Sequence, residues 1–165
     1  MQKRILSLIL APSCLALACF IAALPAMAET FTGGNNITVT VPDGWGVEYE
    51  PDNFQTLLTS PAEDCAVSAQ ALPNVGGQSA KEFCDVFAQS INGSKPEKMP
   101  GHDAYTFDGV LHGVPFTAFA LASSDIIVVF MELGATSDHG KALRAIRSSL
   151  HSEDRTVQKM LDVLK

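Results

Sequence analysis

The sequence predicts an α+β fold: an antiparallel sheet of about six strands with helices packed on it. Short segments that alternate apolar and polar residues, as half-buried strands do, are separated by turn residues. Other segments carry apolar residues three and four apart, which is typical of amphipathic helices. The order along the chain is strands, helix, strands, helix, and this order favours a sandwich of helices on one sheet.

The first group of strands follows from alternation and turn residues. Residues 37–41 (ITVTV) alternate strictly and end at a PDG turn. The alternation resumes over 45–49, and 54–59 is a third extended segment. A turn at 60–64 then leads into 65–72, so the last two segments predict an antiparallel hairpin.

A helix is predicted after these strands. Ser79 and Glu82 have the spacing of a capping box, in which the serine side chain accepts from the glutamate amide and the glutamate side chain reaches back. The sequence NG at 92–93 offers a residue able to adopt positive φ at the end of the helix. The expected apolar face consists of Phe83, Val86, Phe87 and Ile91.

The second half of the chain predicts three strands and two helical segments. The strands are 104–108, 114–122 and 126–131, and the last is the most apolar, so we expect it at the centre of the sheet with both faces covered. Ser137 or Asp138 can cap the following helix. Its buried stripe is Leu143, Ile146 and Leu150, and a further amphipathic segment spans 153–165.

The N-terminus predicts export from the cytoplasm. A basic pair precedes an apolar run that ends in PAMA, with small residues one and three places before a cut after Ala28. Residues 1–28 therefore read as a Sec-type signal peptide, and 29–165 as one periplasmic or secreted domain without a stable transmembrane segment. Two alternatives stay open: an uncleaved membrane anchor, and a lipoprotein processed before Cys19.

Charge is distributed unevenly along the chain. Of the 11 Lys and Arg, two lie in the predicted signal peptide, and the remaining nine face 18 Asp and Glu. Residues 29–80 contain no Lys or Arg, whereas the chain from 139 onward has six cations and three acids. Phosphate binding needs a basic face, so nucleic acid is not an expected partner. Three interpretations of the acidic residues stay open: a basic partner, a loosely held divalent cation, and a solvated acidic surface that keeps the protein soluble.

Two cysteines, Cys65 and Cys84, remain after signal cleavage. An even pair in an oxidising compartment predicts one disulfide, which here would tie the first helix to a strand. Closing such a loop would stabilise the fold by about 3 kcal/mol in the chain-entropy model. The alternative is a redox-active or metal-binding pair, although the spacing is far from C-x-x-C.

The sequence contains no recognised catalytic motif. There is no G-x-S-x-G, no phosphate-binding loop and no pair of histidines on one helix face. We therefore predict no catalytic residue and no cofactor. The best metal candidates fall around one predicted hairpin, where turn and loop positions explain them equally well: His102, Asp103, Asp108 and His112.

A candidate partner surface surrounds Trp45, the only tryptophan. A tryptophan at this position is explained either as a core residue under the first turn or as a partly exposed anchor for a partner. The acids that flank it are Asp43, Glu48, Glu50 and Asp52.

Three stretches resemble a known family when taken in order. The first strand ends in VPDGW at 41–45, the turn SP at 60–61 leads into a strand and then a helix, and the later helix ends in IRSSL at 146–150. In these features the chain resembles the PsbP-like superfamily of small α/β/α sandwich proteins, which includes DcrB-type bacterial envelope proteins. The likeness spans 37–150. Members are usually binding or assembly modules without a common active site, so the resemblance implies no catalytic residue.

Together, these observations predict a secreted or periplasmic binding or accessory module that docks a protein or an envelope component, rather than an enzyme. Two alternatives remain: a small envelope hydrolase with an unrecognised site, and a weak divalent-metal-binding protein.

Overall fold

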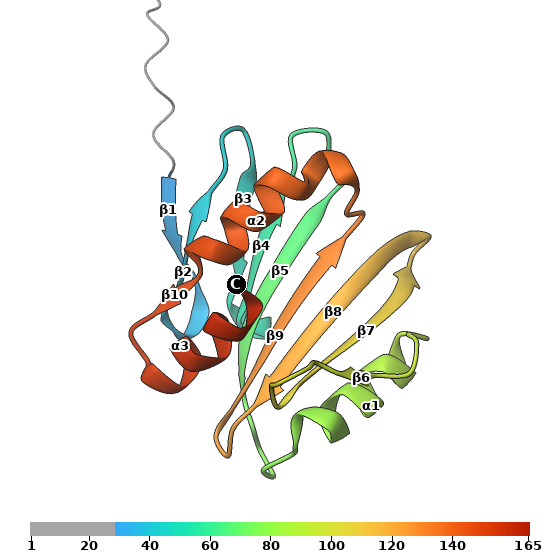
Figure 1. Cartoon of the computed structure of the whole chain (residues 1–165). Coiled ribbons are helices and arrows are strands. Elements are labelled where there is room, and N and C mark those ends of the chain that lie inside the picture. The colour runs from blue at the N-terminus through green and yellow to red at the C-terminus, as the bar shows by residue number, and fades with distance from the viewer. Residues whose placement is uncertain (1–28) are drawn as a thin grey trace, which may run out of the picture.

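A computed structural model describes residues 29–165, which form two antiparallel sheets and three α-helices (Figure 1). The predicted signal peptide at 1–28, with Cys19, lies outside the described residues. Within 29–165, none of the helices combines the length and the apolar character needed to span a membrane.

The larger sheet has seven strands, and every pairing in it is antiparallel. The α+β class predicted from the sequence is therefore confirmed. In spatial order the strands are β3 (Gly46–Glu50), β4 (Gln55–Thr59), β5 (Ala66–Pro73), β9 (Ile126–Leu133), β8 (Val114–Ala122), β7 (Ala104–Leu111) and β6 (Glu97–Lys98).

Strand β9 occupies the centre of this sheet, between β5 and β8, as its apolar sequence predicted. Successive side chains of a strand point to opposite faces. Val128 and Phe130 accordingly lie in one hydrophobic core, while Ile127 and Val129 lie in a second core on the other face.

One face of the large sheet, here called the α2 face, is covered by two helices and the small sheet (Figure 1). The helices are α2 (Gly140–Ser149) and α3 (Arg155–Leu161). The small sheet has the order β1 (Glu29–Thr32), β2 (Ile37–Val41), β10 (His151–Ser152). The core beneath them includes the predicted stripe Leu143, Ile146 and Leu150, together with Ile37, Val39 and Val41.

The opposite face, here called the α1 face, is covered by α1 (Ala80–Ser90), which contacts β7 and β8. The predicted capping box is present at Ser79 and Glu82. The prediction that Val86 belongs to the buried apolar face of this helix is wrong, because Val86 is 61% exposed. The fully buried positions of the helix are Ala80, Cys84 and Ala88, flanked by the half-buried Phe83 and Phe87.

Candidate functional site

The acids Glu48 and Glu50 lie on one side of an edge strand. Strand β3 ends the seven-stranded sheet and pairs only with β4 in the part of the chain that the structure describes. Its residues alternate, so that Val47 and Tyr49 are half-buried toward the α2 face while Glu48 and Glu50 are exposed on the α1 face. Two of the predicted partner-surface residues therefore share one exposed face.

The other predicted members of this surface are dispersed. Asp43 and Asp52 are exposed in the turns at opposite ends of β3. Trp45 is half-buried and packs against the core of the α2 face. The structure thus reduces the predicted surface to an acidic strand with one acid beyond each end.

Further acids lie at one end of β3, in the turn between β4 and β5. Asp64 is held there by two contacts: the Ser60 hydroxyl donates to its Oδ1 at 2.8 Å, and His139 Nε2 lies 3.1 Å from the same oxygen. The Ser60 hydrogen bond, followed by the attraction of His139, lowers the pKa of Asp64 below its ordinary value. The carboxylate therefore stays charged. Asp64 and its neighbour Glu63 were not part of the predicted surface.

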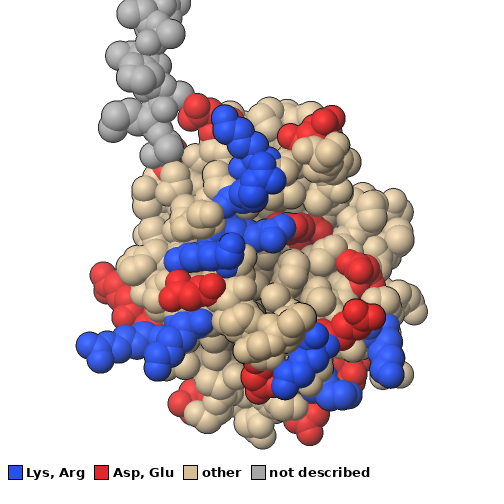
Figure 2. Space-filling model, in the orientation of Figure 1, with Lys and Arg blue, Asp and Glu red and all other residues tan. Residues whose placement is uncertain are grey.

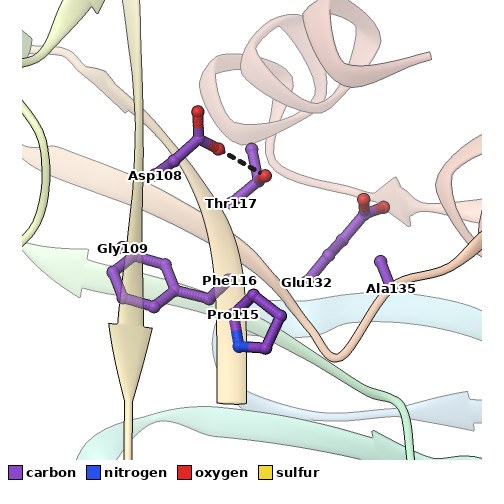
Figure 3. Close-up of a pocket in the computed structure, with 7 residues that line it drawn as sticks. All are labelled: Asp108, Gly109, Pro115, Phe116, Thr117, Glu132 and Ala135. Atoms are coloured by element: carbon purple, nitrogen blue, oxygen red, sulfur yellow. Dashed lines mark hydrogen bonds between the residues drawn. The ribbon is translucent and has the colours of Figure 1, made fainter. Parts of the chain in front are cut away.

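A hollow of about 220 Å³ opens on the large sheet near the N-terminal end of β8 (Figure 3). Three polar residues of the hollow lie on the α2 face of the sheet, because they are cross-strand partners in one row: Asp108 on β7, Thr117 on β8 and Glu132 on β9. The Thr117 hydroxyl donates to Asp108 Oδ1 at 2.6 Å. The rest of the wall comes from Gly109, Pro115, Phe116 and Ala135.

Glu132 in this hollow is already neutralised. Its side chain is 6% exposed, and both its oxygens accept from Arg147 on α2, Oε1 from Nε at 2.7 Å and Oε2 from Nη2 at 2.8 Å. The Arg147 guanidinium also lies 5.8 Å from the centre of the Phe119 ring. This arrangement anchors α2 to the sheet and leaves Asp108 as the unneutralised carboxylate of the hollow.

The four metal candidates do not form one site. His102 and Asp103 precede β7, Asp108 lies within it, and His112 follows it in the turn to β8. The eight residues of β7 separate Asp103 from His112, and the nine steps of about 3.3 Å along this extended chain span about 30 Å. Asp103 also faces Lys98, 3.6 Å away. Among residues 29–165, no group of three or more His, Cys, Asp or Glu side chains is placed to hold a metal ion.

The predicted disulfide between Cys65 and Cys84 is not formed in the structure, which corrects the expectation from the sequence. Both cysteines are free and buried. The physical reason is the sheet itself, because Cys65 belongs to the core of the α2 face and Cys84 on α1 to the core of the α1 face. Burial raises the pKa of Cys65 to about 11 and that of Cys84 to about 12, so both remain thiols.

No protein-family profile matches this sequence, and no curated protein matches it. Among solved structures, the chain is similar to cyanobacterial PsbP from Synechocystis sp. PCC 6803, with 12% identity and a TM-score of 0.49 over 78% of this chain and 95% of that one. It is also similar to LpqN of Mycobacterium tuberculosis, a protein involved in cell envelope biogenesis, with 14% identity and a TM-score of 0.42 over 74% and 88% of the two chains.

A third similar structure is a protein of Bacteroides thetaiotaomicron, with 11% identity and a TM-score of 0.48 over 79% of this chain. The matched part spans 50% of that protein's length. One of these three structures is thus a PsbP, from the superfamily that the sequence resembles. The similarity is one of fold, and no functional argument rests on it.

Proposed function

We propose that this chain is a secreted, non-enzymatic binding module that docks a protein partner carrying Lys or Arg through the acidic strand β3. The observation that supports the proposal best is the exposure of Glu48 and Glu50 on an edge strand with one unpaired side. An edge strand offers backbone donors and acceptors to a partner, and its side chains select which partner binds.

The charge around β3 supports a basic partner. Residues 29–80 contain no Lys or Arg, so the chain has no nearby cation in sequence to neutralise this strand. Among the described residues, Glu48, Glu50 and Asp52 form no ion pair. Unscreened charge of one sign accelerates encounter with a partner of the opposite sign and suppresses wrong partners.

The proposal is tested by affinity capture from envelope extract, using residues 29–165 as bait. The variant Glu48→Gln/Glu50→Gln/Asp52→Asn removes three charges with little change of shape. A matched control, Glu97→Gln/Asp125→Asn/Glu153→Gln, removes three exposed charges elsewhere. We expect a stoichiometric partner that the control retains and the β3 variant loses, with the melting temperatures of both nearly unchanged.

Raising the salt concentration should weaken capture by the wild-type bait, since the contact is between exposed charges. A partner captured equally by the wild type and the β3 variant would remove this strand from consideration.

A further inference from the structure

We propose, building on the function above, that the partner inserts a short extended segment in which Lys or Arg alternates with apolar residues. The segment would lie in a groove on the α1 face, at the end of the sheet where β3 begins. The groove consists of two hollows that share Glu63 in their walls, one of about 360 Å³ and one of about 200 Å³.

The two hollows follow one row of the sheet. Gly46, Thr59, Ala66 and Leu133 are successive cross-strand partners on β3, β4, β5 and β9, and all four residues line a hollow. Neighbouring strands lie about 4.8 Å apart, so this row is about 14 Å long. An extended segment of about four or five residues covers that length.

The floor of the groove is apolar and uncovered. Leu57 and Leu133 are half-buried, and Val114 at the start of β8 is 40% exposed. Helix α1 covers the same face of the sheet only farther along, where it contacts β7 and β8. Apolar side chains of a partner would bury this surface, at roughly 25 cal/mol per Å² removed from water.

The walls of the groove are acidic. Glu48, Glu63 and Asp64 line it, and no Lys or Arg is among its lining residues. Asp64 is paired with His139, whereas Glu48 and Glu63 form no ion pair within 29–165. Carboxylates above an apolar floor match Lys and Arg, whose long aliphatic stems pack on apolar surface while the charged ends reach outward.

The turn that carries Glu63 and Asp64 is held in place before any partner arrives. The Glu63 amide donates to the Ser60 carbonyl at 2.9 Å, and the backbone of Glu63 adopts a left-handed conformation with φ of 57°. Ser60 also fixes Asp64, as described above. A turn whose backbone is already fixed reduces the entropy lost on binding, which favours affinity for a short segment.

The test is an NMR titration of ¹⁵N-labelled residues 29–165 with three synthetic eight-residue peptides. One alternates Lys and Val, one alternates Lys and Ser, and one alternates Glu and Val. We expect the Lys–Val peptide to bind saturably and to shift the amides of Leu57, Glu63, Ala66 and Val114. The Lys–Ser peptide should bind several-fold more weakly, and the Glu–Val peptide should not bind.

The variant Glu63→Gln/Val114→Ser should weaken binding of the Lys–Val peptide about tenfold, since it removes one wall charge and one floor contact. The matched control is Glu97→Gln/Val110→Ser, because Val110 is also exposed, at 59%, but lies on β7. The control should bind like the wild type. No saturable binding at millimolar peptide, equal binding of the Lys–Ser peptide, or shifts centred outside the groove would overturn the proposal.

The experiments distinguish a failure of the groove proposal from a failure of the β3 docking proposal. If the bait with Glu63→Gln/Val114→Ser still captures an envelope partner that the β3 variant loses, the docking function stands and the groove is not its site. If the β3 variant captures the same partner as the wild type, docking through β3 is wrong.

Discussion

Glu132 is a buried carboxylate on the central strand, and Arg147 supplies its charge partner from α2. A buried charge is tolerated when its oxygens are fully hydrogen-bonded, and the two parallel N–H donors of a guanidinium meet both oxygens at once. The Phe119 ring beneath Arg147 holds the guanidinium in position. The contact therefore fixes where α2 lies on the sheet.

We expect Arg147→Met to lower the free energy of unfolding by about 2–4 kcal/mol, because Glu132 would be left buried without its partner. Urea unfolding at pH 7 measures the change. The matched control is Arg144→Met on the exposed side of the same helix, which should stay within about 0.5 kcal/mol of wild type.

The double variant Glu132→Met/Arg147→Met separates charge burial from packing. It should recover most of the lost stability, since no charge is then left in the core. If Arg147→Met unfolds at the same urea concentration as the wild type, the pair does not anchor the helix.

At the residue scale, the sequence identified single candidates but not their neighbours. Asp108 was chosen as a metal ligand, yet its side chain accepts a hydrogen bond from Thr117, and Glu132 lies one strand farther along the same cross-strand row. The alignment of these three side chains depends on the register of β7, β8 and β9, and a local sequence pattern does not predict register between strands. Likewise, Glu63 and Glu48 line the same hollow only because the turn between β4 and β5 folds beside the start of β3. The exposed alternation of Glu48 and Glu50, by contrast, is local and was predictable.

At the scale of elements, α1 shows how a local signal specifies a helix end. The Ser79 hydroxyl accepts from the Glu82 amide at 3.2 Å, and Glu82 Oε2 accepts from the Ser79 amide at 2.9 Å. These two hydrogen bonds satisfy donors that the helix itself leaves free. Hydrogen bonds from Ser79 lower the pKa of Glu82 below its ordinary value.

We expect Ser79→Ala to lower the free energy of unfolding by about 1 kcal/mol at pH 7. A carboxylate whose folded pKa is lowered contributes stability above its unfolded pKa and loses it as the pH falls through the folded value. The difference between wild type and Ser79→Ala should therefore shrink, without vanishing, below about pH 4. Urea unfolding at neutral and acidic pH checks this, with the exposed Ser124→Ala as control. A difference that grows on acidification would contradict the role of Glu82.

The elements that the sequence missed lack a periodic signal. Strand β1 has the sequence ETFT, with one apolar residue, and is formed by pairing with β2. Strands β6 and β10 have two residues each, too few to show any period. Helix α2 begins two to three residues after the predicted caps, because Thr136 caps a short 3-10 turn that precedes it. Tertiary pairing, rather than propensity, decides these boundaries.

At the scale of the whole molecule, the sheet separates two cores, and each core holds one thiol. We expect native residues 29–165 to show no reaction with a thiol reagent at pH 8, since both thiols are buried and their pKa values are raised to about 11 and about 12. After unfolding in guanidinium without reductant, two thiols per chain should react. Reaction of the native protein would contradict the burial, and no reaction after unfolding would establish a disulfide.

The charges of the molecule are distributed unevenly between the two faces of the large sheet. The chain after 139, which forms α2 and α3, carries six Lys and Arg against three acids, and Figure 2 shows cations over these helices. The strand β3 and the groove beside it carry acids on the other side of the sheet. An uneven distribution of charge gives the molecule a dipole, which orients it in the electric field of another charged molecule.

The pairing of β2 with β10 joins segments more than 100 residues apart, and the Thr40 amide also donates to Ser149 at the end of α2. These long-range contacts affect the order in which the elements fold. Contacts between distant segments form slowly, because a long loop must close before they give any stability. Strand β2 therefore completes its pairing and its packing only with the last fifteen residues, and a chain truncated after Leu150 would leave Ile37 and Val39 without part of their cover.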